Sequence, residues 1–380
     1  MQLSVIILNY NVRYFLELCV LSVQKALENV DGEIIVVDNN SQDNSCEMMK
    51  QRFPSVKLIE NKENSGFPKG NNIGVAAAKG EYICILNPDT VVAEDTFTKV
   101  LAFAKKQKEL GIVGVKLIDG TGNFLPESKR GIPTPFVAFT KITGLYKLFP
   151  TTFGEYYAQH LSENETGKVD ILVGAFMLMK RDLYNEIGGF DENCFMYSDD
   201  IDLSYMALKK GKSNYYFHET SVIHYKGEST VKDGTYMKRF QEAMNFFYKK
   251  HFRVSILFFV FMKIGIVFFS MIKKLQGKPK PKSNPEKYIL VSEDAVLREK
   301  LENKWQTLVE RQDITKSFAE NTKTEIIFDQ NQLDFKTIIQ AFETNKNKNF
   351  TFKIIPESAD FVIGSNSSFD RGEVIKILDF

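Results

Sequence analysis

Carboxylates stand at two places where an apolar run of strand-forming residues stops. Residues 82–86 lead into an Asn-Pro pair followed by Asp89, and residues 33–37 lead into Asp38. In an open parallel α/β sheet, ligands bind outside the carboxyl ends of the strands. We therefore expect Asp89 to face a ligand or its metal ion, unless it caps the helix predicted at 93–106. Asp38 either accepts hydrogen bonds from a base or ribose, or it only forms a turn.

A third acidic cluster contains Asp199, Asp200 and Asp202 and opens a helix predicted from 199 to about 210. Carboxylates at a helix N-terminus are favoured by capping and by the helix dipole, but three exceed what capping needs. A carboxylate pair near a metal-bound anion can supply a general base. His224 ends a predicted strand and is either structural or a ligand. Imidazole, carboxylate and phosphate oxygens together suit Mn²⁺ or Mg²⁺.

The elements that position these side chains alternate along the first 120 residues. Strands are predicted at 3–8, 33–37, 56–59, 82–86 and 112–117, and helices at 14–27, 43–53, 75–79 and 93–106. Strands that alternate with helices of this length imply βαβ units and a mostly parallel sheet. Residues 64–74 are predicted to be a glycine-rich turn whose amides face a ligand, although the turn matches neither the dinucleotide-binding fingerprint nor a P-loop.

After residue 120 the regular alternation stops. Residues 120–165 contain four prolines and many aromatics, which predicts a long excursion over the site. Its concentrated positive charge includes Arg130, which contacts a phosphate or is simply solvated. The apolar run at 171–179 contains Gly174-Ala175, whose small side chains let an extended ligand approach the backbone closely.

The composition is that of an ordinary globular protein, with 43% apolar and 26% charged residues. A length of 380 residues favours two domains. The formal net charge of +1 gives no reason to expect a nucleic acid partner. Four scattered cysteines without a CxxC pair suit a reducing cytosol. The N-terminus enters a strand pattern at once, so we expect no secretory signal.

Residues 254–272 are strongly apolar, apart from Lys263, and have lysines beyond them. This pattern predicts a helix lying in the inner leaflet of a membrane, with a buried helix or a single span as the alternatives. Residues 278–285 have the composition of a linker. Strands are then predicted at 287–291, 324–328, 351–355 and 360–363, with helices near 295–310 and 335–343. This part reads as a small α/β domain.

Taken in order, eight short motifs resemble the inverting family 2 glycosyltransferases of GT-A fold, in the subgroup often called rhamnosyltransferase-like. The motifs are Val5-Ile-Ile-Leu-Asn-Tyr-Asn11, Val36-Val-Asp-Asn-Asn-Ser41, Asn64-Ser-Gly-Phe67 leading to Gly70-Asn-Asn72, Leu86-Asn-Pro-Asp-Thr90, Gly174-Ala-Phe-Met-Leu178, Gly188-Gly-Phe-Asp191, Phe195-Met-Tyr-Ser-Asp-Asp200 and Val222-Ile-His-Tyr-Lys-Gly227. Each motif alone is weak, but their order over about the first 250 residues is specific.

The resemblance implies a role for individual residues. The family's metal motif falls on Asn87-Pro-Asp89, with asparagine at its first position, so Asp89 becomes the main metal carboxylate and His224 the second metal ligand. The acidic pair falls on Asp199 and Asp200, of which Asp200 is the implied catalytic base. Donor contacts are implied for the residues at the matched strand ends and turns, which are Asn9, Tyr10, Asp38, Gly70, Asn71, Asn87, Asp89, Gly174 and Ala175. The implied cofactor is Mn²⁺ or Mg²⁺.

The resemblance also implies an activity. The enzyme would transfer one sugar with inversion from a UDP- or dTDP-sugar, dTDP-rhamnose among them, to a glycan or lipid-linked acceptor in surface polysaccharide synthesis. The expected domains are a GT-A catalytic domain at 1–250, a membrane-associating segment and linker at 251–285, and a small α/β accessory domain at 286–380. We expect a cytoplasmic protein that is peripheral on the inner face of the membrane, with a single span as the alternative. The rival function is a catalytically inactive nucleotide-sugar-binding scaffold.

Overall fold

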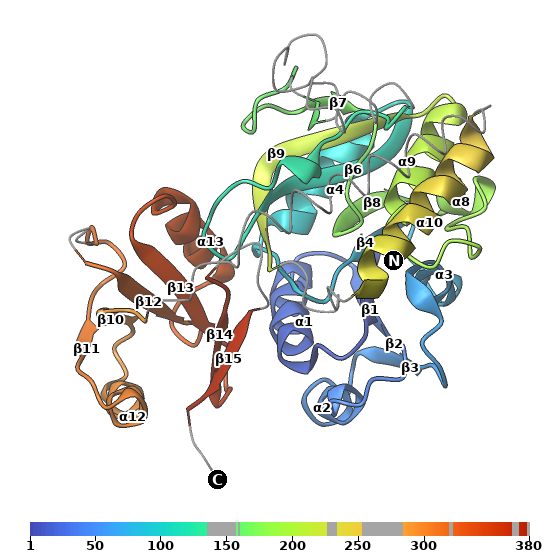
Figure 1. Ribbon diagram of the computed structural model, residues 1–380. Helices are drawn as coiled ribbons and strands as arrows, with labels where there is room; N and C mark the ends of the chain where they lie inside the picture. Colours follow the sequence, from blue (N-terminus) through green and yellow to red (C-terminus); the bar gives the residue numbers. More distant parts are fainter. Residues whose placement is uncertain are drawn as a thin grey trace.

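The computed structural model contains two mixed β-sheets with helices packed around them (Figure 1). It describes residues 1–134, 157–158, 160–225, 234–252, 284–318, 322–366 and 372–377. The larger sheet has nine strands and the smaller, C-terminal sheet has six. The predicted fold class, a mixed and largely parallel α/β sheet of GT-A type with a second, smaller α/β unit, is confirmed.

Four parallel strands form the first half of the larger sheet, in the order β3-β2-β1-β4. Their bounds are β1 Leu3–Asn9, β2 Gly32–Asp38, β3 Lys57–Glu60 and β4 Tyr82–Leu86. The side chains of β1 are buried along its whole length, as expected for a central strand covered on both faces. The chain runs outward from β1 to β2 and β3 and then returns to the other side of β1 as β4. Such a reversal of strand order brings the carboxyl ends of neighbouring strands to one crevice.

The second half of the larger sheet is mixed. Its strands are β5 Thr90–Val91, β6 Leu110–Ile118, β7 Gly167–Val169, β8 Phe176–Lys180 and β9 Ser213–His224. Strand β9 runs unbroken although its register against β6 shifts along the pair, and it ends at His224, as predicted. The two-residue β5 pairs antiparallel with the end of β9, and this pairing sets Thr90 opposite His224.

The glycine-rich segment forms a helix, α3 Gly66–Ala76, instead of the predicted turn. A Cβ atom on Gly70 would collide with Leu8, and one on Gly74 would collide with Ile6. The two glycines therefore let α3 lie close on β1, and this packing outweighs their low helix propensity. The amides of Gly66 and Phe67 are taken by Asn64 Oδ1 and by the carbonyl of Phe195, so they do not face a ligand as predicted.

Helices cover both faces of the larger sheet. They are α1 Arg13–Leu27, α2 Ser45–Arg52, α4 Thr96–Lys106, α8 Arg181–Glu186, α9 Asp199–Lys209 and α10 Gly234–His251. In the described part of the chain, no helix combines the length and apolarity needed to cross a membrane. The predicted membrane segment at 254–272 lies outside the described residues.

The C-terminal sheet has the strand order β11-β10-β12-β13-β14-β15 and is parallel from β11 to β13. Its strands are β10 Lys287–Val291, β11 Val309–Arg311, β12 Thr324–Asp329, β13 Phe350–Ile355, β14 Phe361–Gly364 and β15 Glu373–Lys376, with helices α12 Ala295–Trp305 and α13 Phe335–Thr344. The helix predicted near 295–310 ends at Trp305, and the strands β11 and β15 were not predicted.

The two sheets share one apolar core. A single cluster of buried side chains continues from β1 and α1 into α13, β13 and β14. Tyr14 packs edge-on against Phe361, with 4.8 Å between ring centroids. Gly122 has a positive φ of 80° and lies so close to Phe342 that a Cβ atom would strike its carbonyl group. Figure 1 shows α13 on the side of the C-terminal sheet that faces the larger one.

Glu94 joins the two sheets through the N-terminus of α13. Its Oε1 accepts the amide of Phe335 at 2.7 Å, and its Oε2 accepts the amide of Lys336 at 2.9 Å. The first amides of a helix have no partner within the helix, so an acceptor there stabilises it. A second contact is the ion pair between Lys116 and Glu343, at 2.9 Å.

We expect Glu94→Ala to lower the free energy of unfolding of the full chain by about 1–2 kcal/mol, because two helix amides lose their acceptor. Urea unfolding followed by circular dichroism measures this change. The control is Glu299→Ala, at an exposed position of α12. Equal midpoints for the two variants would mean that the bonds from Glu94 add nothing to the junction.

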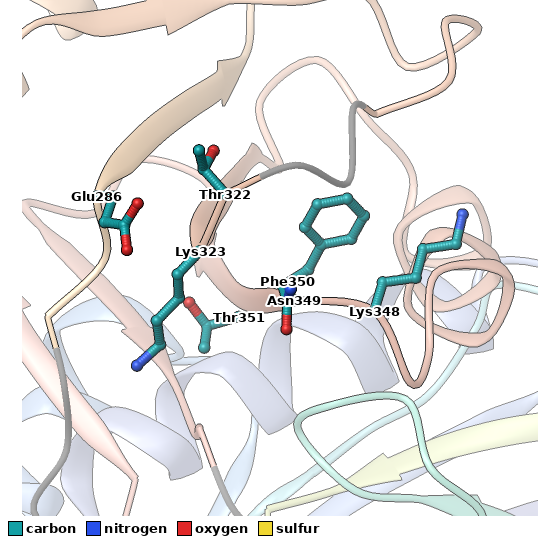
Figure 2. Close-up of a pocket in the computed structure, with 7 residues that line it drawn as sticks. All are labelled: Glu286, Thr322, Lys323, Lys348, Asn349, Phe350 and Thr351. Atoms are coloured by element: carbon teal, nitrogen blue, oxygen red, sulfur yellow. The ribbon is translucent and has the colours of Figure 1, made fainter.

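A hollow of about 380 Å³ lies at the amino ends of β12 and β13 in the C-terminal sheet (Figure 2). It is lined by Glu286, Thr322, Lys323, Lys348, Asn349, Phe350 and Thr351. In the view of Figure 2 the side chains of Lys323 and Lys348 extend to opposite sides of Phe350. None of the side chains for which the sequence predicts a catalytic or binding role lines this hollow.

Candidate active site

The carboxyl ends of β1 and β2 meet at Asn9 and Asp38, which are register partners in the parallel pair. Asn9 Nδ2 donates to Asp38 Oδ2 at 2.7 Å, and the amide of Ser41 donates to Asp38 Oδ1 at 2.8 Å. Both side chains are buried. Asn9 Oδ1 is buried without a hydrogen-bond partner in the described residues. Asp38 thus has its turn-forming role, and the neighbouring Asn9 oxygen is left for another donor.

The end of β4 and the end of β9 bring Asp89 and His224 together. Asp89 Oδ1 lies 3.4 Å from His224 Nε2, and both side chains are less than 10% exposed. Asn87 Nδ2 also lies 3.4 Å from the same ring nitrogen. The amide of Tyr225 donates to the carbonyl of Asp89 at 3.0 Å and fixes this junction. Helix α4 has Asp95 at its N-cap position, so Asp89 does not cap that helix.

These side chains suit a divalent cation. A carboxylate oxygen and an imidazole nitrogen are established ligand types, and two neighbouring ligands of an octahedral ion lie about 3 Å apart. His224 Nδ1 and Asn87 Oδ1 are both buried without a hydrogen-bond partner in the described residues. No group of three or more His, Cys, Asp or Glu side chains with metal-binding geometry occurs in the described part of the chain. Asp89 and His224 are therefore two adjacent side chains of the donor types that a divalent cation accepts.

The acidic pair lies at the start of α9. Asp200 Oδ2 accepts the amide of Gly174 at 3.1 Å and the guanidinium of Arg130 at 2.6 Å. A Cβ atom on Gly174 would stand 3.5 Å from Asp200 and 3.8 Å from Asp199 Oδ2. The backbone around Gly174 therefore lies directly against both carboxylates, and the predicted approach of an extended ligand to it stays a prediction. The carbonyl of the next residue, Ala175, accepts the amide of Asn87 at 3.1 Å and so connects the backbone beside the acidic pair to the segment that leads to Asp89.

Burial and the adjacent Asp200 carboxylate raise the pKa of Asp199 to about 7, although Arg130 and nearby amides act in the opposite direction. Ionising both carboxylates in a shared buried site is unfavourable because their charges repel each other, so one of them keeps its proton to a higher pH. A group with a pKa near the working pH is suited to proton transfer. The pair therefore has the electrostatics of an acid–base site.

We expect Asp199→Asn to stabilise the protein at pH 8 by a few kcal/mol, since each unit of pKa shift corresponds to about 1.4 kcal/mol. The folded carboxyl keeps its proton up to a pKa of about 7, whereas the unfolded one loses it near 3.8. The free energy of unfolding therefore falls as the pH rises from about 4 to 7. Urea titrations at pH 8 and pH 4.5 measure the difference. A gain that is equal at the two pH values would contradict the raised pKa of Asp199.

Asp202, the third carboxylate of the cluster, faces away from this pair. Its Oδ1 lies 2.5 Å from His251 Nε2, and its Oδ2 lies 2.8 Å from Lys250 Nζ. Asp202 therefore joins α9 to the end of α10. Capping was one role considered for these carboxylates, but Asp202 instead pairs with the end of α10.

Arg130 is a residue that the sequence left ambiguous. Its side chain is only 11% exposed and pairs with Asp200, so the solvated alternative is wrong. The neighbouring Lys129 is also buried, and its Nζ donates to the carbonyl of Leu161 at 2.8 Å. In the sequence, only the concentrated positive charge at 129–130 pointed to a role for Arg130. Its partner, Asp200, lies 70 residues further along the chain.

The other predicted donor-binding residues lie around the same strand ends. Tyr10 follows β1 and is half-buried. Asn71 is buried in α3, where its Nδ2 donates to the carbonyl of Phe67 and its Oδ1 has no partner in the described residues. Gly70 faces Leu8 of β1. The donor contacts of these residues stay predictions.

Residues 4–188 match the sequence profile described as "Glycosyl transferase family 2". These residues belong to glycosyl transferase family 2. The protein is therefore a glycosyltransferase, and Asn9, Asp38 and Asp89 all lie within the matched range. The transferase continues beyond that range into α9 and the end of β9, which carry the acidic pair and His224.

Relatives of the transferase include a rhamnosyltransferase and a glucosyltransferase. The N-acetylglucosaminyl-diphospho-decaprenol L-rhamnosyltransferase of Mycobacterium tuberculosis is 27% identical over 243 residues, which are 61% of this chain and 78% of that protein. The poly(ribitol-phosphate) beta-glucosyltransferase of Bacillus spizizenii is 29% identical over 171 residues, 43% of this chain and 26% of that protein. Among solved structures, the mannosyltransferase PcManGT from Pyrobaculum calidifontis in complex with GDP-Man and Mn²⁺ has a TM-score of 0.46, with 17% identity over 73% of this chain and 76% of that one.

Proposed function

We propose that this transferase moves a single sugar, with inversion, from a UDP- or dTDP-sugar to a hydroxyl group of a glycan or lipid-linked acceptor in surface polysaccharide synthesis. The observation that supports this proposal is that three pairs of side chains lie at the same edge of the larger sheet. These groups are Asn9 with Asp38, Asp89 with His224, and Asp199 with Asp200. The rhamnosyltransferase relative supports dTDP-rhamnose as one candidate donor and a lipid diphosphate as one candidate acceptor.

The nucleoside end of the donor is assigned to the ends of β1 and β2. Asp38 is a buried carboxylate that already accepts two hydrogen bonds, and it can accept further bonds because a carboxylate offers about four lone-pair sites. The buried and unpartnered Asn9 Oδ1 is a second acceptor beside it. Two acceptors suit the N–H and O–H donors of a base and a ribose. No basic side chain is required at this end.

The diphosphate is assigned to the junction of β4 and β9. Asp89 and His224 would hold Mn²⁺ or Mg²⁺ there, and a divalent ion supplies charge neutralisation for a diphosphate leaving group. Asn87 stands where the family more often has a carboxylate, and its amide oxygen is a neutral oxygen ligand. The buried Asn87 Oδ1 and His224 Nδ1 have no other partner in the described residues.

The chemical step needs one base. The acceptor oxygen forms a bond to the anomeric carbon while the bond from that carbon to the diphosphate breaks, and the leaving group takes the bonding electrons. Asp200 accepts the proton of the acceptor hydroxyl. A single displacement from the face opposite the leaving group inverts the anomeric centre, as in inverting glycosidases, where water takes the place of the acceptor. Asp199 stands beside Asp200, against the backbone of Gly174.

A membrane surface is the proposed location of the acceptor. Helix α10 ends at His251. In the sequence, residues 252 and 253 separate this end from the apolar run at 254–272. A lipid-linked acceptor would have to be presented at the membrane, and an apolar helix flanked by lysines suits the headgroup region. The proposed location is the cytoplasmic face, because nucleotide-sugar donors must reach the same site.

A thermal-shift panel of UDP, dTDP, GDP and CMP, each with Mn²⁺ or with EDTA, tests the donor assignment. A nucleotide at about 100 times its dissociation constant stabilises the folded protein by about 2.7 kcal/mol, which this measurement resolves. We expect one base to give a shift that requires Mn²⁺. No shift with any nucleotide would contradict the proposal. A shift without turnover of the corresponding nucleotide sugars would favour the inactive scaffold.

A further inference from the structure

Asp200 is held from three directions. Its Oδ2 accepts the Arg130 guanidinium at 2.6 Å and the Gly174 amide at 3.1 Å, while its Oδ1 accepts the Ile201 amide at 2.7 Å. The side chains of Arg130 and Asp200 are 11% and 12% exposed. A charge-assisted bond of this length in a largely dry setting is stronger and more directional than a surface ion pair. The orientation of the carboxylate is therefore fixed before any substrate binds.

Arg130 is itself anchored at the acidic pair. Its Nη2 donates to the carbonyl of Leu172 at 3.0 Å, and its backbone exchanges two 2.9 Å hydrogen bonds with Ile171. Its neighbour Lys129 binds the carbonyls of Ala158 and Leu161, which secures the returning end of the excursion. The backbone that carries the guanidinium is therefore held in place by hydrogen bonds on both of these residues.

The charges around Asp200 are unbalanced without Arg130. Asp199 is the adjacent carboxylate, and it faces the same backbone at Gly174. Asp202, on the same helix, is paired with Lys250 and His251 on α10. Within the described part of the chain, Arg130 is the cation that contacts Asp200. Two adjacent buried carboxylates without a cation would repel each other and take up a proton.

We propose that Arg130 is a positioning residue of the transfer reaction, which holds the Asp200 carboxylate against the Gly174 amide, where the acceptor hydroxyl must arrive. This inference rests on the proposed function. A base is effective only if its lone pair lies within hydrogen-bond reach of the proton it abstracts. The guanidinium fixes that geometry through its 2.6 Å contact with Asp200 Oδ2. Arg130 acts through Asp200 and does not itself touch the reacting atoms.

The test compares Arg130→Gln and Arg130→Lys in the full chain. The control is Arg298→Gln, which removes a more exposed arginine in α12. kcat and donor KM are measured from pH 6 to pH 9.5 with the nucleotide sugar whose base gives the metal-dependent shift. We expect Arg130→Gln to lower kcat at pH 7 by about 10²-fold and to leave donor KM within about threefold. The loss is smaller at pH 9 than at pH 7, because Arg130 lowers the pKa of the Asp199 carboxyl, and its removal delays the ionisation of the acidic pair to higher pH. Arg130→Lys restores part of kcat.

Two kinetic outcomes overturn the proposal. A rise in donor KM with unchanged kcat would mean that Arg130 contacts the donor phosphates. A fall in kcat that is the same at every pH and is not relieved by lysine would mean that the arginine is merely structural.

A second readout separates this proposal from the proposed function. ¹³C NMR follows the carboxyl signal of Asp199, assigned with the Asp199→Asn variant, through a pH titration, because Arg130 lowers the pKa of this carboxyl. It requires no active donor. Arg130→Gln must move this titration to higher pH, and an unchanged titration rejects the pairing role even if the enzyme transfers no sugar from any donor tested.

Discussion

Replacing Asp200 by asparagine is expected to lower the rate of sugar transfer by about 10²–10⁴-fold, the usual contribution of a general base. Asparagine has nearly the same shape and still accepts the Gly174 amide through its carbonyl oxygen, so the fold around α9 should persist. It cannot take the proton of the acceptor hydroxyl. Metal-dependent binding of the donor nucleotide should be unchanged, because Asp200 is placed with the acceptor and not with the diphosphate. Single-turnover transfer assays and calorimetric nucleotide titrations measure the two quantities.

The control for this variant is Asp313→Asn, an exposed aspartate in the C-terminal part of the chain. Asp199→Asn is the informative companion, since the two carboxylates are neighbours and only one can be the base. A transfer rate for Asp200→Asn within about threefold of the wild-type rate would remove Asp200 from that role. If Asp199→Asn alone abolished transfer, the role would pass to Asp199, whose pKa of about 7 is suited to it.

Replacing Asp89 by alanine is expected to abolish the stabilisation that the donor nucleotide gives in the presence of Mn²⁺. At about 100 times the dissociation constant this stabilisation amounts to about 2.7 kcal/mol. The expectation follows from the 3.4 Å approach of Asp89 to His224 and from their burial, because removal of one member of this pair would leave the proposed metal site incomplete. Thermal shifts with Mn²⁺ and with EDTA measure the effect.

His224→Gln should act in the same direction as Asp89→Ala. His218→Gln is the matched control, since His218 lies on the same strand and its ring bonds to Thr166 instead. In EDTA, the variants and the wild type should bind the nucleotide equally. If Asp89→Ala weakened binding to the same extent with and without the metal, Asp89 would contact the nucleotide directly and the metal role would be lost.

Much of the larger sheet followed from the sequence. The strands β1, β2 and β4 are short apolar runs bounded by turn-forming residues, and the alternation with helices predicts parallel pairing. Parallel pairing alone is enough to bring the ends of neighbouring strands to one edge. The placement of Asn9 beside Asp38 was therefore predictable in outline, and the structure supplies the 2.7 Å bond between them.

Local turn and helix propensities gave the wrong element where close packing requires glycine. Residues 66–76 are rich in glycine and asparagine, which indicate a turn, yet they form α3. The reason is that Gly70 and Gly74 face β1 at a distance where a Cβ atom would not fit. A helix propensity is worth at most about 1 kcal/mol per glycine, and the burial of a whole helix face outweighs it.

The sequence by itself determined which residue types are present and, through their motifs, the membership of a glycosyltransferase family. The tertiary structure alone decided which side chains meet. Asp89 meets His224 because β5 pairs with the end of β9, and Asp200 meets Arg130 across 70 residues of sequence. The tertiary structure also pairs Asp202 with His251 at the end of α10, and it joins the C-terminal sheet to the larger sheet through one apolar core. Periodicity is encoded locally, within one helix or strand, whereas these contacts depend on long-range closure and on which buried charges find a partner.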